Sequence, residues 1–170
     1  MNSDSSDYKN HLKIFSYGSN NMNQLKIRIE RQTDINFNSA YLDNYTRIFA
    51  GFSQRWKGGV ASIYPSPNKR VYGSVFYLTM DEIEKLDKFE GGYSRMILKV
   101  KEKFKEVFQE TQAFLYIKNN PYYSHMPSED YLNAISRMLY ESDQQYKNSI
   151  KIKGVDENDQ IREISVWVKN

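Results

Sequence analysis

The spacing of apolar residues along the chain switches between the two-residue period of strands and the three-to-four-residue period of helices. Pro65 and Pro67 are expected to end one strand, so that the strands before and after them form a hairpin. The expected strands are Lys13–Tyr17, Ala40–Phe52, Val60–Tyr64, Val71–Leu78, Tyr93–Val100, Gln112–Lys118 and Ile161–Val168. Because strands and helices do not alternate regularly, the pattern predicts an α+β fold built on a mixed sheet or small barrel.

Three helices are expected between these strands, over residues 22–30, 79–89 and 127–140. The first follows the turn formers Ser19-Asn20-Asn21, which supply a helix cap. The second opens with Thr79-Met-Asp-Glu82, the spacing of a capping box, in which the two side chains accept backbone N–H groups at the helix start. Gly91-Gly92 is expected to stop this helix, because glycine readily takes the left-handed conformation at a helix end.

Length and composition predict one domain, residues 11–170, preceded by a leader. The 170 residues are 39% hydrophobic and 15% aromatic, which is enough for one real core. Residues 1–10 have almost nothing apolar to bury, so we expect a flexible leader there. The absence of cysteine excludes disulfides, thiolate metal sites and a cysteine nucleophile.

Charge and hydropathy narrow the possible partners. The 24 Lys and Arg against 21 Asp and Glu give a formal charge of +3, with both signs interspersed. Glu102 interrupts the densest basic stretch, so no nucleic-acid partner is expected; an RNA-binding domain, suggested by the charge and the many aromatic residues, is the third hypothesis. No apolar run approaches the ~18 to 20 residues that cross a bilayer. Since the first residues are also polar and acidic, we expect a cytoplasmic protein with no membrane partner.

Glu90 is the most suggestive single residue. Continued helical spacing would place it on the same face as Ile83 and Leu86, and so beside apolar neighbours. Burial and the negative end of the helix would both raise the pKa of its carboxyl group, as a general acid/base at neutral pH requires. The alternative is a frayed, solvent-facing helix end where Glu90 pairs with Arg95.

The segment Phe15-Ser-Tyr-Gly-Ser-Asn20 joins a strand to a helix start. Gly18 permits the turn, and free N–H groups there could hold an anion or oxyanion; the alternative is a purely structural turn. With two histidines and neither an H-E-x-x-H nor a G-x-S-x-G pattern, metalloprotease and serine hydrolase templates fail. Four tyrosines could line a pocket or simply pack in the core, namely Tyr93, Tyr122, Tyr123 and Tyr131.

In order and approximate spacing, several short motifs resemble the gamma-glutamylcyclotransferase superfamily, which shares the AIG2-like fold. They are Phe15-Ser-Tyr-Gly-Ser-Asn20 with Met22-Asn23, Trp56-Lys-Gly-Gly-Val-Ala-Ser-Ile-Tyr-Pro-Ser66, Val71-Tyr-Gly-Ser-Val-Phe-Tyr77, Leu86-Asp-Lys-Phe-Glu-Gly91 followed by Tyr93, and, more weakly, Pro127-Ser-Glu-Asp-Tyr131. The resemblance covers roughly residues 13 to 140.

This resemblance implies a small mixed β-barrel flanked by helices, with a cavity at the Tyr17–Asn20 loop. The family's catalytic glutamate falls on Glu90. Substrate binding falls on Phe15, Ser16, Tyr17, Gly18, Ser19 and Asn20, with Tyr93 and Tyr131 lining the pocket. The resemblance further implies a small-molecule gamma-glutamyl substrate, a homodimer, and no metal or cofactor.

The implied reaction needs no nucleophile from the protein. The substrate's own α-amine attacks its γ-carbonyl, releasing 5-oxoproline and a free amino acid or amine. The short Gly91-Gly92 link between Glu90 and Tyr93 resembles the gamma-glutamylamine branch, and Asn21 is an extra residue before Met22, so the leaving group stays open. The alternative function is a non-catalytic module of the same fold that binds a ligand or a protein.

Overall fold

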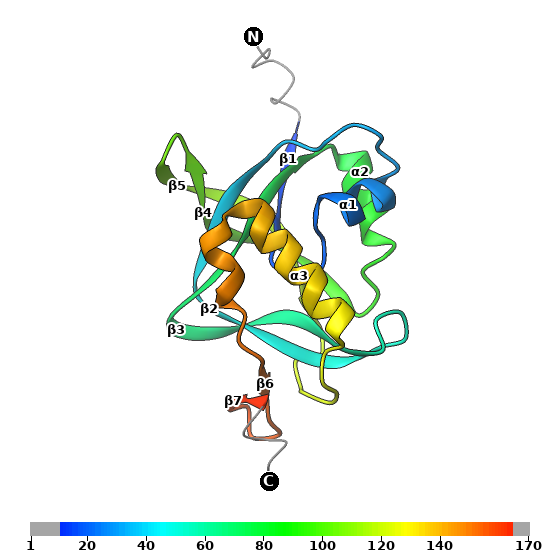
Figure 1. The fold of residues 1–170 in the computed structure, drawn as a ribbon, viewed down its shortest axis with the longest axis vertical. Helices are drawn as coiled ribbons and strands as arrows, with labels where there is room; N and C mark the ends of the chain where they lie inside the picture. The colour runs from blue at the N-terminus through cyan, green and yellow to red at the C-terminus, as the bar shows by residue number, and fades with distance from the viewer. Residues whose placement is uncertain (1–10, 165–170) are drawn as a thin grey trace.

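We describe residues 11–164 of the computed structural model (Figure 1). The expected leader, residues 1–10, and the end of the last expected strand lie outside these residues. The elements in chain order are β1 Leu12–Ser16, α1 Met22–Ile29, β2 Phe37–Ser53, β3 Gly58–Leu78, α2 Met80–Asp87, β4 Tyr93–Phe104, β5 Val107–Lys118, α3 Glu129–Ser142, the 3-10 helix η1 Gln144–Ser149, β6 Lys153–Val155 and β7 Ile161–Glu163.

Strands β1 to β5 form a closed barrel in the order β1-β3-β2-β4-β5, and β6 and β7 form a separate two-stranded sheet. The barrel closes where β1, antiparallel to β3, pairs in parallel with β5 at Ile14 and Phe114. Because this pairing is the one parallel contact in the barrel, the sheet is mixed. The prediction of an α+β fold with a small mixed barrel is therefore confirmed.

The expected hairpin around Pro65 and Pro67 is wrong. Residues 58–78 form one strand, β3, whose hairpin partner is β2 along nearly its whole length. The ladder shifts register between the Tyr45–Pro65 and Asp43–Arg70 pairs, so the segment 66–69 bulges from the sheet. Proline cannot donate a ladder hydrogen bond, and a bulge is where that bond is not required. Pro67 lies in this bulge and Pro65 pairs at its edge, so β3 continues past both prolines.

The predicted helix starts are confirmed. Asn21 caps α1, with its side chain accepting from the Gln24 N–H, and Ser128 caps α3. Both hydrogen bonds of the Thr79–Glu82 capping box are present at the start of α2. This helix ends at Asp87, slightly earlier than expected, and Gly92 takes a left-handed φ of 82° in the loop that follows. We call residues 88–92, between α2 and β4, the Glu90 loop.

Helices cover two sides of the barrel (Figure 1). On one side α1 and α2 lie side by side and bury Leu25, Ile29, Ile83 and Leu86 against the barrel. On the other side α3 crosses β2 and β3 and contributes its own apolar face, made by Ile135, Met138 and Leu139. Within residues 11–164, no helix has both the length and the apolar character needed to cross a membrane.

Candidate active site

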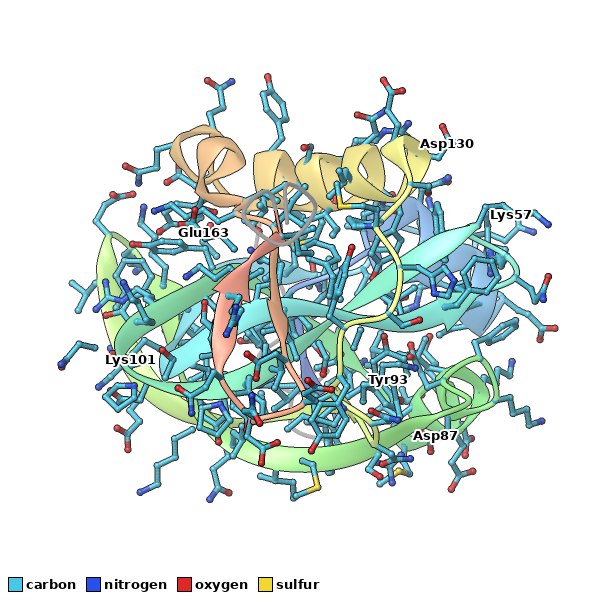
Figure 2. The ribbon with its side chains drawn as sticks, turned by 90° about the horizontal axis from the view of Figure 1, so that it is seen from below. Lys57, Asp87, Tyr93, Lys101, Asp130 and Glu163 are labelled. Atoms are coloured by element: carbon cyan, nitrogen blue, oxygen red, sulfur yellow. The ribbon has the colours of Figure 1, made fainter. Side chains whose placement is uncertain are left out.

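A cavity of about 360 Å³ opens between the β1–α1 turn, the Glu90 loop and the start of α3. All of the site residues that the family resemblance implies line it, namely Phe15, Ser16, Tyr17, Gly18, Ser19, Asn20, Glu90, Tyr93 and Tyr131; the other two candidate tyrosines, Tyr122 and Tyr123, do not. Figure 2 marks Asp87 and Tyr93, the residues on either side of the Glu90 loop. The tertiary structure therefore gathers three segments that are far apart in the sequence around one hollow.

Glu90 reaches this cavity from a turn, because α2 ends three residues earlier. The Glu90 N–H donates to the Asp87 carbonyl at 3.1 Å, and the Glu90 carbonyl accepts from the Tyr93 N–H at 3.0 Å, which fixes the turn. The side chain is 10% exposed. The helical-face argument for Glu90 was therefore wrong in its geometry, although the side chain does point inward.

The Glu90 carboxylate contacts the β1–α1 turn and α1. Its Oε1 accepts from Asn20 Nδ2 at 3.0 Å and lies 3.4 Å from Arg28 Nη1. The alternative pairing with Arg95 is wrong, because Arg95 instead binds Asp87 at 2.6 Å. Burial raises the pKa of Glu90, with a smaller rise from the nearby Asp87 charge, while the Asn20 hydrogen bond and the Arg28 charge oppose it; the net direction is upward.

The β1–α1 turn presents backbone donors beside this carboxylate. Within the described chain, the N–H groups of Gly18, Ser19 and Asn20 donate to no acceptor. In the first turn of α1, the Met22 N–H donates to Glu141 and the Gln24 N–H donates to Asn21, so these two donors are occupied. The available donors are therefore those of the turn, one step before the helix itself.

Two tyrosines form a rigid wall of the cavity through one peptide segment of β3. The Tyr93 hydroxyl donates to the Ala61 carbonyl, and the Tyr131 hydroxyl accepts from the Ala61 N–H, both at 2.7 Å. The Trp56 ring packs edge-on against Tyr131, with 5.1 Å between ring centroids. Burial raises the pKa of Tyr131 to about 12 and that of Tyr93 well above its usual value, so both rings stay neutral near pH 7.

Sequence reasoning missed Arg28, which is 8% exposed and holds the site together. Its Nη1 donates to Asn20 Oδ1 at 3.0 Å, and Gln24 Nε2 donates to the same oxygen at 3.0 Å. Burial lowers the pKa of Arg28, and Glu90 opposes that effect. The signal was present in α1, where Gln24 and Arg28 share a helical face four residues apart beside the apolar Leu25 and Ile29.

Sequence reasoning also missed Arg47, which supports the β1–α1 turn through its backbone. This buried residue donates from Nε to the Tyr17 carbonyl at 2.8 Å and from Nη2 to the Tyr72 carbonyl at 2.9 Å. Burial lowers its pKa to about 10, so it is still charged at neutral pH. An arginine inside an otherwise apolar strand run was the available signal, because buried charges usually have a structural or functional task.

Comparison with known proteins identifies the family to which this chain belongs. A family model described as "Gamma-glutamyl cyclotransferase, AIG2-like" matches residues 14–133, which hold the cavity's turn, loop and tyrosines. The chain belongs to this family. The expectation drawn from the short motifs is thus confirmed at the family level.

Family relatives with similar sequences include the gamma-glutamylcyclotransferases of mouse and human. The mouse protein is 29% identical over 157 residues, covering 89% of this chain and 82% of the relative. The human protein is 29% identical over 162 residues, covering 92% and 85%. A solved gamma-glutamyl cyclotransferase structure superposes with a TM-score of 0.70 and 26% identity, covering 94% of this chain and 99% of that one. The chain therefore resembles enzymes of this family along nearly its whole length.

Proposed function

We propose that this protein is a gamma-glutamylcyclotransferase that converts gamma-glutamyl amino acids or gamma-glutamyl amines into 5-oxoproline and the free amino acid or amine. The observation that carries the proposal is the buried Glu90 carboxylate, which lines a ligand-sized cavity and accepts a hydrogen bond from Asn20 at 3.0 Å. It places a candidate acid/base next to unoccupied backbone donors. The relatives named above support the same chemistry.

The reaction is intramolecular, and most of its advantage comes from holding one conformation. The substrate's α-amine must face its own γ-carbonyl so that a five-membered ring can close. Intramolecular attack in the right geometry can contribute on the order of 7 to 11 kcal/mol to lowering the barrier. The rigid wall of Tyr93 and Tyr131, fixed on the Ala61 peptide, supports such positioning.

Glu90 is proposed to carry the proton through the reaction. Its carboxylate takes a proton from the substrate's α-ammonium, and the free amine forms a bond to the γ-carbon. In the tetrahedral intermediate Glu90 returns this proton to the leaving nitrogen, whose bond to the γ-carbon then breaks; the ring nitrogen gives up its second proton, and the leaving amine takes up a proton to become the ammonium. The atoms balance without water, because the acyl group passes from one nitrogen to another.

The β1–α1 turn is proposed to hold the negative charge. Backbone N–H groups of Gly18, Ser19 and Asn20 could bind either the oxyanion of the intermediate or the substrate's α-carboxylate. Asn20 and Arg28 keep the Glu90 carboxylate oriented and offset part of the pKa rise that burial causes. A carboxyl group with a moderately raised pKa can both accept and donate a proton near neutral pH.

Glu90→Gln tests this function, because it keeps the shape and the hydrogen-bonding capacity of the side chain while removing the base. We expect near-complete loss of 5-oxoproline release from gamma-glutamyl amino acids, with the variant still folded by circular dichroism. Exposed Glu84→Gln on α2 is the matched control and should be fully active. Unchanged turnover by Glu90→Gln would refute the proposed mechanism. Substrate-induced melting shifts without turnover by the wild type would favour the non-catalytic module instead. The homodimer and the cytoplasmic location stay predictions.

A further inference from the structure

The charged residues that line the cavity are mostly cations. Arg28, Arg55 and Lys118 face a single lining carboxylate, that of Glu90. Arg28 is the partner of Glu90, whereas Arg55 and Lys118 form no ion pair with any residue between 11 and 164. Three cations against one carboxylate leave a formal charge of +2 around the hollow. A cavity with this imbalance attracts a ligand that carries excess negative charge.

Lys118 lies in a slot at the end of the Glu90 loop. It is the last residue of β5 and pairs across the ladder with Tyr93, whose ring centroid is 5.2 Å from the Lys118 ammonium. A methyl group added at Gly51 would lie 2.7 Å from Lys118 Cε, and one at Gly92 would lie 3.6 Å from Nζ. Both glycines have positive φ, 58° and 82°. The backbone on two sides, at Gly51 and Gly92, thus approaches the Lys118 side chain at residues that have no side chain of their own.

The position of Lys118 matters because of where a leaving group must go. Glu90 has to protonate the leaving nitrogen, so that nitrogen lies at the carboxylate, and the rest of the leaving group extends along the neighbouring wall. Gly91 and Tyr93, which follow Glu90 directly, line the same cavity as Lys118. The ammonium of Lys118, 5.2 Å from the Tyr93 ring centroid, therefore lines the wall along which a leaving group would extend from Glu90.

The two classes of substrate differ in the charge of this leaving group. A gamma-glutamyl amino acid brings a carboxylate on the carbon next to the scissile nitrogen, while a gamma-glutamyl alkylamine brings only an apolar chain. A carboxylate would satisfy an ammonium that has no anionic partner among the described residues. An alkyl group would leave it unpaired and partly desolvated, which is unfavourable.

We propose that Lys118 binds the α-carboxylate of the leaving amino acid and so makes the enzyme selective for gamma-glutamyl amino acids over gamma-glutamyl amines. This inference rests on the proposed cyclotransferase function. Arg55, which is exposed at the rim of the cavity with its guanidinium 5.7 Å from the Trp56 ring centroid, adds to the positive field but is not assigned a contact. The short Glu90 loop did not distinguish an amino-acid leaving group from an amine. Lys118 favours the amino acid.

Gamma-glutamylalanine and gamma-glutamylethylamide form a matched pair of probes, because they differ only by the leaving-group carboxylate. We expect wild-type kcat/KM to favour gamma-glutamylalanine by about 10- to 150-fold, the range for a hydrogen bond to a charged group. Lys118→Met keeps an unbranched side chain in the slot and removes the charge. It should lower kcat/KM on gamma-glutamylalanine and raise kcat/KM on the ethylamide, which no longer leaves an ammonium unpaired, so that the two values converge.

Controls separate selectivity from folding. Lys118→Gln should lose the preference in the same way, and thermal melts should match the wild type. Lys99→Met, which changes an exposed lysine of β4 outside the cavity, should keep the full preference. Equal wild-type turnover of the two probes, or an equal fall on both in Lys118→Met, would overturn this inference and leave the cyclotransferase function standing. Release of 5-oxoproline from neither probe would overturn both.

Discussion

Asn20→Ala is expected to impair proton transfer by Glu90 although the Glu90 side chain itself is unchanged. The Asn20 side chain links three groups: Nδ2 donates to the Glu90 carboxylate, and Oδ1 accepts from Arg28 and Gln24, each at 3.0 Å. Alanine removes all three hydrogen bonds. The carboxylate then keeps only the longer 3.4 Å contact with Arg28 and is free to rotate away from the substrate.

The size of the effect follows from the lost bond. A hydrogen bond to a charged, buried group is worth about 1.5 to 3 kcal/mol, and each 1.36 kcal/mol is a factor of ten in rate, so kcat/KM should fall about 10- to 150-fold. The Asn20 bond lowers the pKa of Glu90, so its loss raises that pKa further. Because Glu90 must be ionised to accept the proton, the acidic limb of the kcat/KM profile should move to higher pH. The loss is therefore largest on the acidic side.

The assay is 5-oxoproline release from gamma-glutamylalanine across the pH range. Thermal melts measure how much stability is lost when Arg28 and Gln24 lose their shared acceptor. Asn133→Ala, at an exposed position of α3, is the control and should behave as the wild type. Asn20→Asp keeps the acceptor for Arg28 and Gln24 but sets a second carboxylate against Glu90, so it should be at least as impaired. An unshifted acidic limb in folded Asn20→Ala, or a fully active Asn20→Asp, would refute the reasoning.

Two further predictions concern the element that leads into the Glu90 loop. Leu86→Ala empties a fully buried position among Ile83 and Tyr116 and should lower the free energy of unfolding by about 2 to 5 kcal/mol, measured in urea; a loss well below that range would contradict the packing described. Thr79→Ala removes the side-chain acceptor of the capping box and should cost about 1 kcal/mol in the same measurement, whereas Thr79→Ser should recover most of it. Equal stabilities of these two Thr79 variants would show that the cap contributes little.

Features that depend on near neighbours were predictable from the sequence. The Thr79 and Ser128 caps join residues three apart, and the start of α1 is set by the turn formers before it. The β1–α1 turn was likewise identified, together with Tyr93, Tyr131 and Glu90 as cavity residues. In the caps the motif and its spacing contain the interaction, so the surrounding fold adds little to it, whereas the cavity residues were identified through the resemblance of short motifs to a known family.

Other features were decided by strand pairing. The continuous β3 could not be expected from its two prolines, because the register shift that tolerates them depends on the partner strand β2. Glu90 was expected on a helical face, but it is brought inward by a turn that begins after α2 ends. Local spacing describes a helix, and it cannot describe the direction in which a loop leaves it.

The amino-acid sequence by itself determined the α+β class, the helix starts and the short motifs of the site, because these depend on contacts within a few residues. Only the tertiary structure brought Asn20 to Glu90, residues 70 apart, and Arg28 to the same carboxylate across 62 residues. It alone placed Lys118 beside the Glu90 loop. Barrel closure sets these distances, and the free energy of that closure comes from apolar burial spread along the whole chain, which no single segment encodes.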